Sequence, residues 1–186
     1  MKKKWVLSFL LSGLLLFTGC QTTTEKIKET SGSTEQEEVT ERFKKGTVET
    51  TDYRIKIIDS TMTYGHDEEL NLIVFTYEFT NLSNKLLAAS DQFNQSFGAS
   101  QELDDTVETL DASLPPYNSA FNTLYDKGLS KVKPEKTITA VAVYKLIDSK
   151  KSVVLSAYNT KSGREIGRKT FIPDIALEET KDLDDL

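Results

Sequence analysis

The segment LNLIVFTYEFTN, which spans Leu70 to Asn81, carries apolar side chains on both faces of a β-strand. Successive side chains of a strand point to opposite faces. One face therefore receives Ile73, Phe75, Tyr77 and Phe79. The other face receives Leu72, Val74 and Thr76, and it is largely apolar too. Because strands with two apolar faces lie inside a fold, we expect a central strand here, covered on both sides.

Further strands are expected on either side of this central segment. Alternation of apolar and polar residues predicts a strand over Tyr53–Ile57, and a weaker pattern predicts one over Asp91–Gln101. Three more predicted strands, separated by polar turns, are Thr137–Ile147, Ser152–Tyr158 and Ile166–Ile172.

Six or seven short strands without a long helical period indicate an all-β fold. Such strands bury one face each when two sheets pack together, so we predict an immunoglobulin-like β-sandwich over residues 46–174. The disulfide and core tryptophan of antibody domains are missing, because the chain has one cysteine, Cys20, and one tryptophan, Trp5. A small closed β-barrel is the structural alternative.

The connection Glu102–Leu129 shows little period of any kind. A connection this long inside a compact domain is usually functional or mobile. Within it, Tyr117, Phe121 and Tyr125 are spaced by four, so a short helix would place them on one side. That side either covers one end of the sandwich or forms an exposed aromatic patch for a protein or glycan partner.

The first twenty residues have the composition of an export signal. Three lysines, Lys2–Lys4, precede an apolar run, Trp5–Phe17, that is short for a bilayer span. The run ends in Leu16-Phe17-Thr18-Gly19-Cys20, which resembles the lipobox of bacterial lipoproteins, although that family usually has leucine where Phe17 stands. The resemblance implies cleavage after Gly19 and a diacylglycerol on Cys20. An ordinary signal peptide or an uncleaved helix is the alternative.

Four parts of the chain are therefore expected. Residues 1–19 form the signal peptide, and residues 20–45 form the lipidated cysteine and a disordered tether, because the segment is polar and has few large apolar residues. Residues 46–174 form the sandwich, and residues 175–186 form an acidic tail. The expected location is the extracytoplasmic face of the cell membrane, with the lipid on Cys20 as the link.

Charge and residue counts exclude several kinds of site. Loss of the three lysines in residues 1–19 takes the formal net charge from −6 to −9, and such a surface repels nucleic acid. With a single cysteine and a single histidine, His66, most zinc sites and nucleophile–histidine arrangements are excluded. We expect no cofactor, and we interpret His66 as a turn residue, with pH sensing as the alternative.

Acidic residues form two clusters, Asp104-Asp105 and Asp67-Glu68-Glu69, both in expected turns. Adjacent strand residues point to opposite faces, so neither cluster alone makes the opposed pair of a glycosidase. An irregular calcium site from Asp104, Asp105 and Asp111 is a second alternative. The sequence thus favours a non-catalytic binding module at the cell envelope. An envelope hydrolase using clustered carboxylates and a purely structural accessory lipoprotein are the alternatives.

Three stretches resemble a family of small Gram-positive lipoprotein domains, domain of unknown function 5067. They are Leu72–Asn81, Phe93–Glu102 and Val132–Leu146. The resemblance covers about Val48 to Pro173 and departs at Glu135, where that family commonly has glycine. It implies an immunoglobulin-like sandwich on the cell surface and carries no reaction or substrate.

Overall fold

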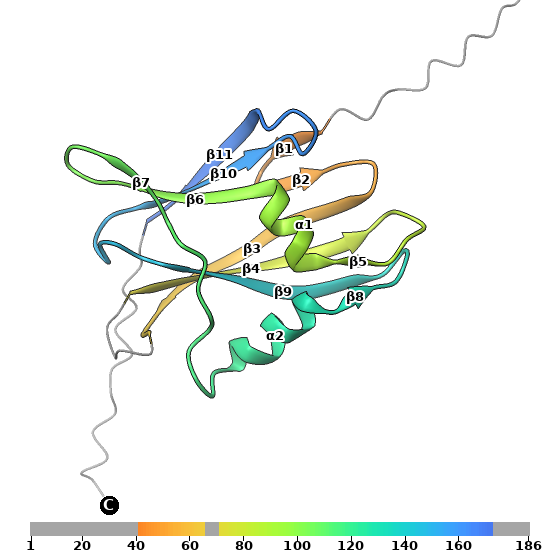
Figure 1. Ribbon diagram of the computed structural model, residues 1–186, viewed down its shortest axis with the longest axis horizontal. Coiled ribbons are helices and arrows are strands. Elements are labelled where there is room, and N and C mark those ends of the chain that lie inside the picture. The colour runs from red at the N-terminus through yellow and green to blue at the C-terminus, as the bar shows by residue number, and fades with distance from the viewer. Residues whose placement is uncertain (1–40, 66–70, 173–186) are drawn as a thin grey trace, which may run out of the picture. The chain divides into compact units, whose positions relative to one another are not determined.

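A computed structural model of the protein describes residues 41–65 and 71–172 (Figure 1). The predicted signal peptide with Gly19 and Cys20, the acidic cluster Asp67–Glu69, His66 and the acidic tail lie outside the described residues. Within them, no helix is long and apolar enough to cross a membrane.

Two antiparallel sheets form the body of the fold, and a two-stranded ribbon accompanies them. The larger sheet has the order β1 (Arg42–Lys44), β2 (Thr47–Glu49), β3 (Tyr53–Thr63), β4 (Leu72–Asn81) and β9 (Thr137–Lys145). The smaller sheet has the order β11 (Glu165–Phe171), β10 (Val153–Tyr158), β6 (Phe97–Glu102) and β7 (Val107–Thr109). The ribbon pairs β5 (Leu87–Ala88) with β8 (Lys131–Val132).

This strand order is that of an immunoglobulin-like sandwich. Strands β3, β4 and β9 correspond to A, B and E, and the order β11-β10-β6-β7 corresponds to G-F-C-C′. The sheets do not close on each other, so the fold prediction is confirmed and the closed barrel is excluded. The six strands expected from the sequence all have a counterpart, and β1, β2, β5, β7 and β8 are additional short strands.

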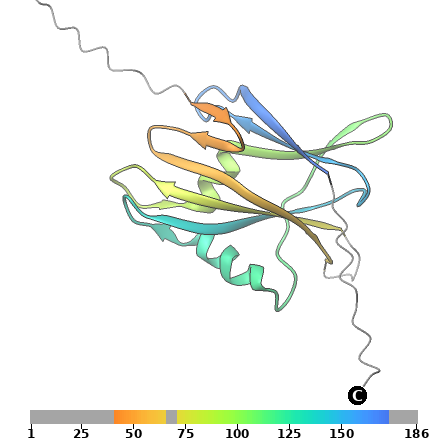
Figure 2. The ribbon, with the colours of Figure 1, turned by 180° about the vertical axis from the view of Figure 1, so that it is seen from behind.

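The core confirms the expected two-sided burial of the central strand. Phe75, Tyr77 and Phe79 are fully buried between the sheets, where they belong to the main core. On the opposite face, Leu72 and Val74 form a second core with residues of β9. This second core is covered by α2 (Ala120–Leu129), which lies beside β9 in both views of the ribbon (Figures 1 and 2).

The segment Asp91–Gln101 was predicted as one strand, and for its first half this is wrong. Residues Ala89–Ser96 form α1, and only Phe97–Glu102 form the strand β6. Ala89, Phe93 and Ser96 are buried, which is the spacing of one helix face. Two of these three residues are small, so the helical period was weak in the sequence.

One domain boundary and one long connection also differ from expectation. The predicted tether, residues 20–45, contains β1, so the ordered domain begins before residue 46. Phe43 of β1 packs edge-on against Phe97, at 6.3 Å between ring centroids. Through Phe43, this otherwise polar segment packs against the main core. The connection 102–129, in turn, contains the short strand β7, the buried Leu110 and the helix α2.

Left-handed backbone occurs in several turns, two of which bear on the sequence predictions. Lys45 and Gly46 have φ values of 52° and 77° and close the β1–β2 hairpin, as two-residue hairpins require. Glu135, where glycine was the expected residue, has a φ of 61° in the turn before β9. Glu135 therefore has a left-handed conformation that glycine, the residue common in the family at this position, adopts without strain.

Candidate functional site

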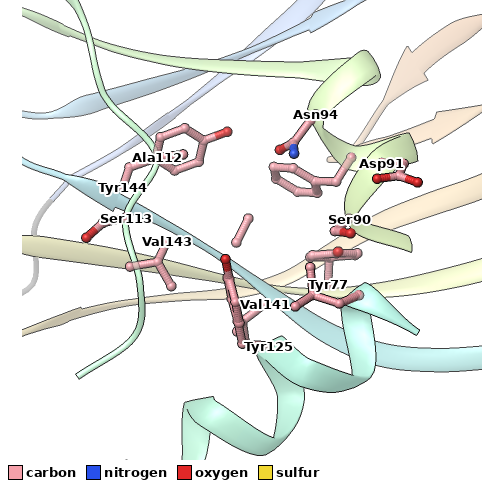
Figure 3. Close-up of a pocket in the computed structure, with 13 residues that line it drawn as sticks. Tyr77, Ser90, Asp91, Asn94, Ala112, Ser113, Tyr125, Val141, Val143 and Tyr144 are labelled. Atoms are coloured by element: carbon pink, nitrogen blue, oxygen red, sulfur yellow. The ribbon is translucent and has the colours of Figure 1, made fainter. Parts of the chain in front are cut away.

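A pocket of about 150 Å³ lies between α1, α2 and β9 (Figure 3). We call it the edge pocket. It is lined by Tyr77, Ser90, Asp91, Phe93, Asn94, Ala112, Ser113, Tyr125, Leu129, Val141, Ala142, Val143 and Tyr144. These residues come from five separate parts of the chain, so the pocket exists only once the sandwich is assembled.

The two helices beside the pocket are tied together at one end. Strand β5 directly precedes α1, strand β8 follows α2 after one residue, and these strands pair with each other. The Nζ of Lys131 lies 3.5 Å from the carboxylate of Asp91, which adds an exposed ion pair across the same joint. The amide of Asn81 donates hydrogen bonds to the carbonyls of Lys85 and Val132, at 2.7 and 2.9 Å, and so fixes this joint to β4. The pocket walls are thus held by the sheet itself.

The outer edge of β9 forms the floor of the pocket. Residues 111–113 pair with its carboxyl-terminal half, where the N–H of Ser113 donates to the carbonyl of Val143 at 2.8 Å. The N–H of Lys145 donates to the carbonyl of Asp111 at 2.9 Å. Backbone groups of an antiparallel strand alternate in direction, so the next outward-facing groups are those of Val141 and Thr139. In residues 41–65 and 71–172 no backbone hydrogen bond reaches them on that side, where α2 packs against β9 and leaves Val141 only 3% exposed.

The hydroxyl of Tyr77 is the least expected polar group at this site. The Tyr77 side chain is fully buried against Phe93, at 4.6 Å between ring centroids, and its hydroxyl has no hydrogen-bond partner in the described part of the chain. Burial raises the pKa of Tyr77 far above its usual range, and it raises the pKa of Tyr144 to about 12. Both phenols are therefore neutral at physiological pH and can each donate and accept a hydrogen bond.

The chemistry available at the pocket is that of contact and hydrogen bonding. The lining contains one carboxylate, Asp91, and no histidine, cysteine or lysine. Apolar atoms come from β9 and from Leu129, while hydroxyls and an amide come from Ser90, Ser113 and Asn94. Such a lining suits a ligand that is partly apolar and has a few polar groups.

The three aromatic residues predicted for partner binding have different positions. Phe121 and Tyr125 lie on α2 and pack on the second core, and Tyr125 also lines the edge pocket. Tyr117 precedes the helix and is 81% exposed. The structure therefore brings Tyr125 to the pocket and leaves Tyr117 on the surface.

The turn that presents Tyr117 is firmly hydrogen-bonded. The carbonyl of Pro116 accepts bonds from the Ser119 hydroxyl at 2.9 Å and from the Asn122 amide at 2.7 Å. Asn118 has a φ of 55°, a conformation that asparagine tolerates better than most residues. Tyr117 thus lies in a turn that is closed by side-chain hydrogen bonds.

The acidic cluster Asp104-Asp105 does not line the edge pocket. The carboxylate of Asp104 accepts a hydrogen bond from Lys151 at 2.6 Å, and this contact lowers the pKa of Asp104. No three acidic, histidine or cysteine side chains of the described residues lie close enough to hold a metal ion. Asp104, Asp105 and Asp111 therefore do not form the calcium site that the sequence allowed.

Sequence reasoning missed most of the pocket, including Tyr77, Ser90, Asn94 and Tyr144. The sequence contained one signal that could have pointed to the pocket. Tyr77 and Tyr144 lie on strands whose other inward residues are purely apolar, and a tyrosine in such a place brings a hydroxyl that needs a partner.

Comparison with known proteins adds the following findings. No protein with a curated description matches the sequence. Two solved structures share the fold. A "putative lipoprotein" from Staphylococcus aureus has a TM-score of 0.64 and 19% identity, with 71% of this chain and 91% of that chain covered. A protein from Enterococcus faecalis has a TM-score of 0.61 and 15% identity, with 72% and 94% covered.

At sequence identities of 19% and 15%, the similarity to these two structures shows the fold alone. The sequence itself matches the family described as Domain of unknown function (DUF5067) over residues 28–159, which is most of the chain. The match includes all of β4, α1, β6 and β9, the elements that carry the floor and one wall of the edge pocket. The protein is therefore a member of the DUF5067 family.

Proposed function

We propose that the protein is a lipid-anchored binding module on the extracytoplasmic face of the cell membrane, and that it holds its partner at the edge pocket. One observation carries the binding role. The buried hydroxyl of Tyr77 has no partner among the described residues, although the pocket beside it has room for a ligand group. Proteins rarely retain a buried polar group without a use or a partner.

The anchor rests on the sequence of the first twenty residues. Thr18-Gly19-Cys20 at the end of an apolar run fits cleavage after Gly19 and a lipid on Cys20. The description of the Staphylococcus aureus structure as a lipoprotein supports the same interpretation. A polar tether after Cys20 would let the domain reach a partner at a distance from the membrane.

Binding is favoured over hydrolysis by the composition of the pocket lining. Hydrolysis of a glycosidic bond by paired acids needs two carboxyl groups facing each other, about 5 to 10 Å apart. Asp91 is the only carboxylate in the lining, and its partner is the cation of Lys131. The site is thus better suited to holding a ligand than to transferring protons.

The test is photo-crosslinking in living cells. Leu129 lines the pocket, is 54% exposed, and can be replaced by a photoreactive phenylalanine analogue. Val107 on β7 is a matched control, because it is 65% exposed and belongs to the other sheet. We expect a discrete crosslinked product from position 129 and none from position 107. Equal or absent products at both positions would contradict the proposal.

A further inference from the structure

Charge is unevenly distributed along the chain. The described residues contain 17 lysines and arginines and 15 aspartates and glutamates, which gives them a formal charge of +2. The whole sequence has a formal charge of −6, so the excess of acid lies in residues 1–40, 66–70 and 173–186 taken together. The sandwich itself is therefore weakly basic, and the acidity of the sequence does not exclude an anionic partner for it.

Basic side chains gather at one narrow edge of the sandwich, where β1 lies beside β11 and the turn before it (Figures 1 and 2). Thr160 of that turn donates hydrogen bonds to the carboxylate of Glu41, and the Lys169 side chain of β11 lies beside Gly46. We call this the basic edge. Six of its exposed cations form no ion pair with another described residue, and they are Arg42, Lys44, Lys45, Lys161, Arg164 and Lys169.

The acidic residues at the basic edge do not neutralise these cations. Lys44 lies opposite Thr47, and the Nζ of Lys169 lies 4.6 Å from the centre of the Phe171 ring. The positive charge of the basic edge is therefore largely directed at solvent. Three carboxylates share the edge, and each already accepts a hydrogen bond there: Glu41 from Thr160, Glu49 from Arg54 and Glu165 from Arg168.

The described chain enters the sandwich at this same edge. Its first residue, Glu41, directly precedes β1, and Cys20 stands about twenty residues earlier in the sequence. A flexible chain of about twenty residues has a root-mean-square span of roughly 25 Å. With a lipid on Cys20, the basic edge would stay near the membrane surface, where tethering favours even weak contacts.

We propose that the basic edge contacts a membrane surface rich in anionic phospholipid, so that the anchored domain is held with β1 and β11 toward the bilayer. This rests on the lipid anchor of the proposed function and adds the orientation of the domain. Clusters of about four to eight basic residues close to a membrane anchor are typical of binding to anionic lipids. The cations are exposed and come from both sheets, so they suit an extended anionic surface better than a single bound ion.

The proposed orientation agrees with the place of the edge pocket. Strands β1 and β9 are the two outer strands of the larger sheet, which has five strands. At about 4.8 Å between neighbouring strands, β1 and β9 are roughly 19 Å apart. With the basic edge at the bilayer, the edge pocket beside β9 faces away from the bilayer, toward a partner in the envelope.

The first experiment is lysine footprinting of the full chain, extracted from membranes and reconstituted in lipid nanodiscs. The discs contain phosphatidylcholine alone or an equal mixture with phosphatidylglycerol, and mass spectrometry follows the acetylation of each lysine. We expect Lys44, Lys45 and Lys169 to react at least about threefold more slowly in the anionic discs. Lys133 and Lys136, exposed in the turn before β9, are internal controls and should react equally in both. Salt at 0.5 M should remove the difference, because it shortens the Debye length to about 4 Å.

The outcomes separate this proposal from the proposed anchor. A chain that does not enter the neutral discs contradicts the anchor, and the orientation with it. A chain that enters both kinds of disc while its lysines react equally in both overturns the contact of the basic edge and leaves the anchor standing. Protection that persists at 0.5 M salt, or that extends equally to Lys133 and Lys136, also overturns the contact.

The second experiment reverses charges at the basic edge. Lys44→Glu combined with Lys161→Glu removes two of its cations, and Lys133→Glu combined with Lys136→Glu makes the same change in net charge elsewhere. All four side chains are exposed and form no ion pair within the described residues, so thermal unfolding midpoints should stay unchanged. We expect the first variant to lose most of the lipid-dependent protection at the remaining lysines of the basic edge and the second to keep it. Equal protection in the two variants overturns the proposal.

Discussion

At the scale of single residues, two buried tyrosines of the same core differ in one respect. The hydroxyl of Tyr53 lies 2.8 Å from the hydroxyl of Ser96, and the two form a hydrogen bond. The hydroxyl of Tyr77 has no such partner in the described part of the chain. A buried polar group without a partner costs about 1 to 3 kcal/mol, whereas a formed hydrogen bond contributes about 1 kcal/mol. The two tyrosines should therefore respond in opposite ways to loss of the hydroxyl.

We predict that Tyr77→Phe raises the free energy of unfolding of the ligand-free protein by about 1 kcal/mol, because it removes an unpaired buried hydroxyl. Tyr53→Phe is the matched control, and it should lower the same quantity by about 1 kcal/mol. Denaturant unfolding of the two variants, followed by fluorescence or circular dichroism, measures both. A loss of stability in Tyr77→Phe would mean that the hydroxyl is already satisfied, and the basis of the proposed site would fall.

At the scale of elements, the sequence was informative where the period of two was strong. The central strand and the sandwich followed from alternation in β3, β4 and β9. The helix α1 was not predicted, because Phe93 and Phe97 are four residues apart. Residues at that spacing lie on one face of a strand and also on one face of a helix. Tyr117, Phe121 and Tyr125 share this spacing. The predicted helix is present for the last two, while the turn at Asn118-Ser119 delays its start until Ala120.

The edge pocket was beyond the reach of sequence reasoning for a different reason. Its lining joins β4, α1, the segment at 112–113, α2 and β9, which are separated by long stretches of chain. Local pattern predicts which residues share a strand face, but it does not predict which connections cross that face. What covers the outer edge of β9 depends on where residues 111–113 pair and where α2 packs, and both are tertiary features.

Strand β1 is the element that sequence reasoning placed in a tether, and its packing can be tested. A Cβ on Gly167 of β11 would lie 2.5 Å from Cδ1 of Phe43, closer than atoms can approach. Gly167→Ala therefore forces β1 away from β11, and we expect it to lower the free energy of unfolding by about 1 to 3 kcal/mol.

A double-mutant cycle provides the control for this prediction. With Phe43→Ala already present, the obstructing ring is gone, and Gly167→Ala should cost markedly less. The measurement is again denaturant unfolding of the single and double variants. If Gly167→Ala costs the same in both backgrounds, the contact between β1 and β11 does not contribute as the structure implies.

At the scale of the whole molecule, two parts of the chain have different proposed roles. The sandwich carries the edge pocket, and the first twenty residues carry the proposed lipid site. The only cysteine of the sequence is Cys20, so the core of the described residues contains no disulfide, and the lipid proposed for Cys20 would use no thiol of that core. The edge pocket is built by the helices and by β9, and β1 begins the domain on the opposite edge of the same sheet. The described chain thus begins at one edge of the larger sheet, and the edge pocket lies at the other.

The lipid on Cys20 is the last prediction. We expect the mature chain to begin at Cys20 and to carry the added mass of a diacylglyceryl group, and mass spectrometry of the protein extracted from membranes measures both. Cys20→Ala removes the only thiol, so the variant should no longer fractionate as an acylated protein, while its thermal unfolding midpoint stays unchanged because the core of the described residues contains no cysteine. One acyl chain holds a protein on a membrane only marginally, whereas two hold it stably, so the diacyl anchor should survive washing with salt. A Cys20→Ala chain that carries the same lipid mass, or an unaltered chain without one, would show that the apolar run attaches the protein by another means.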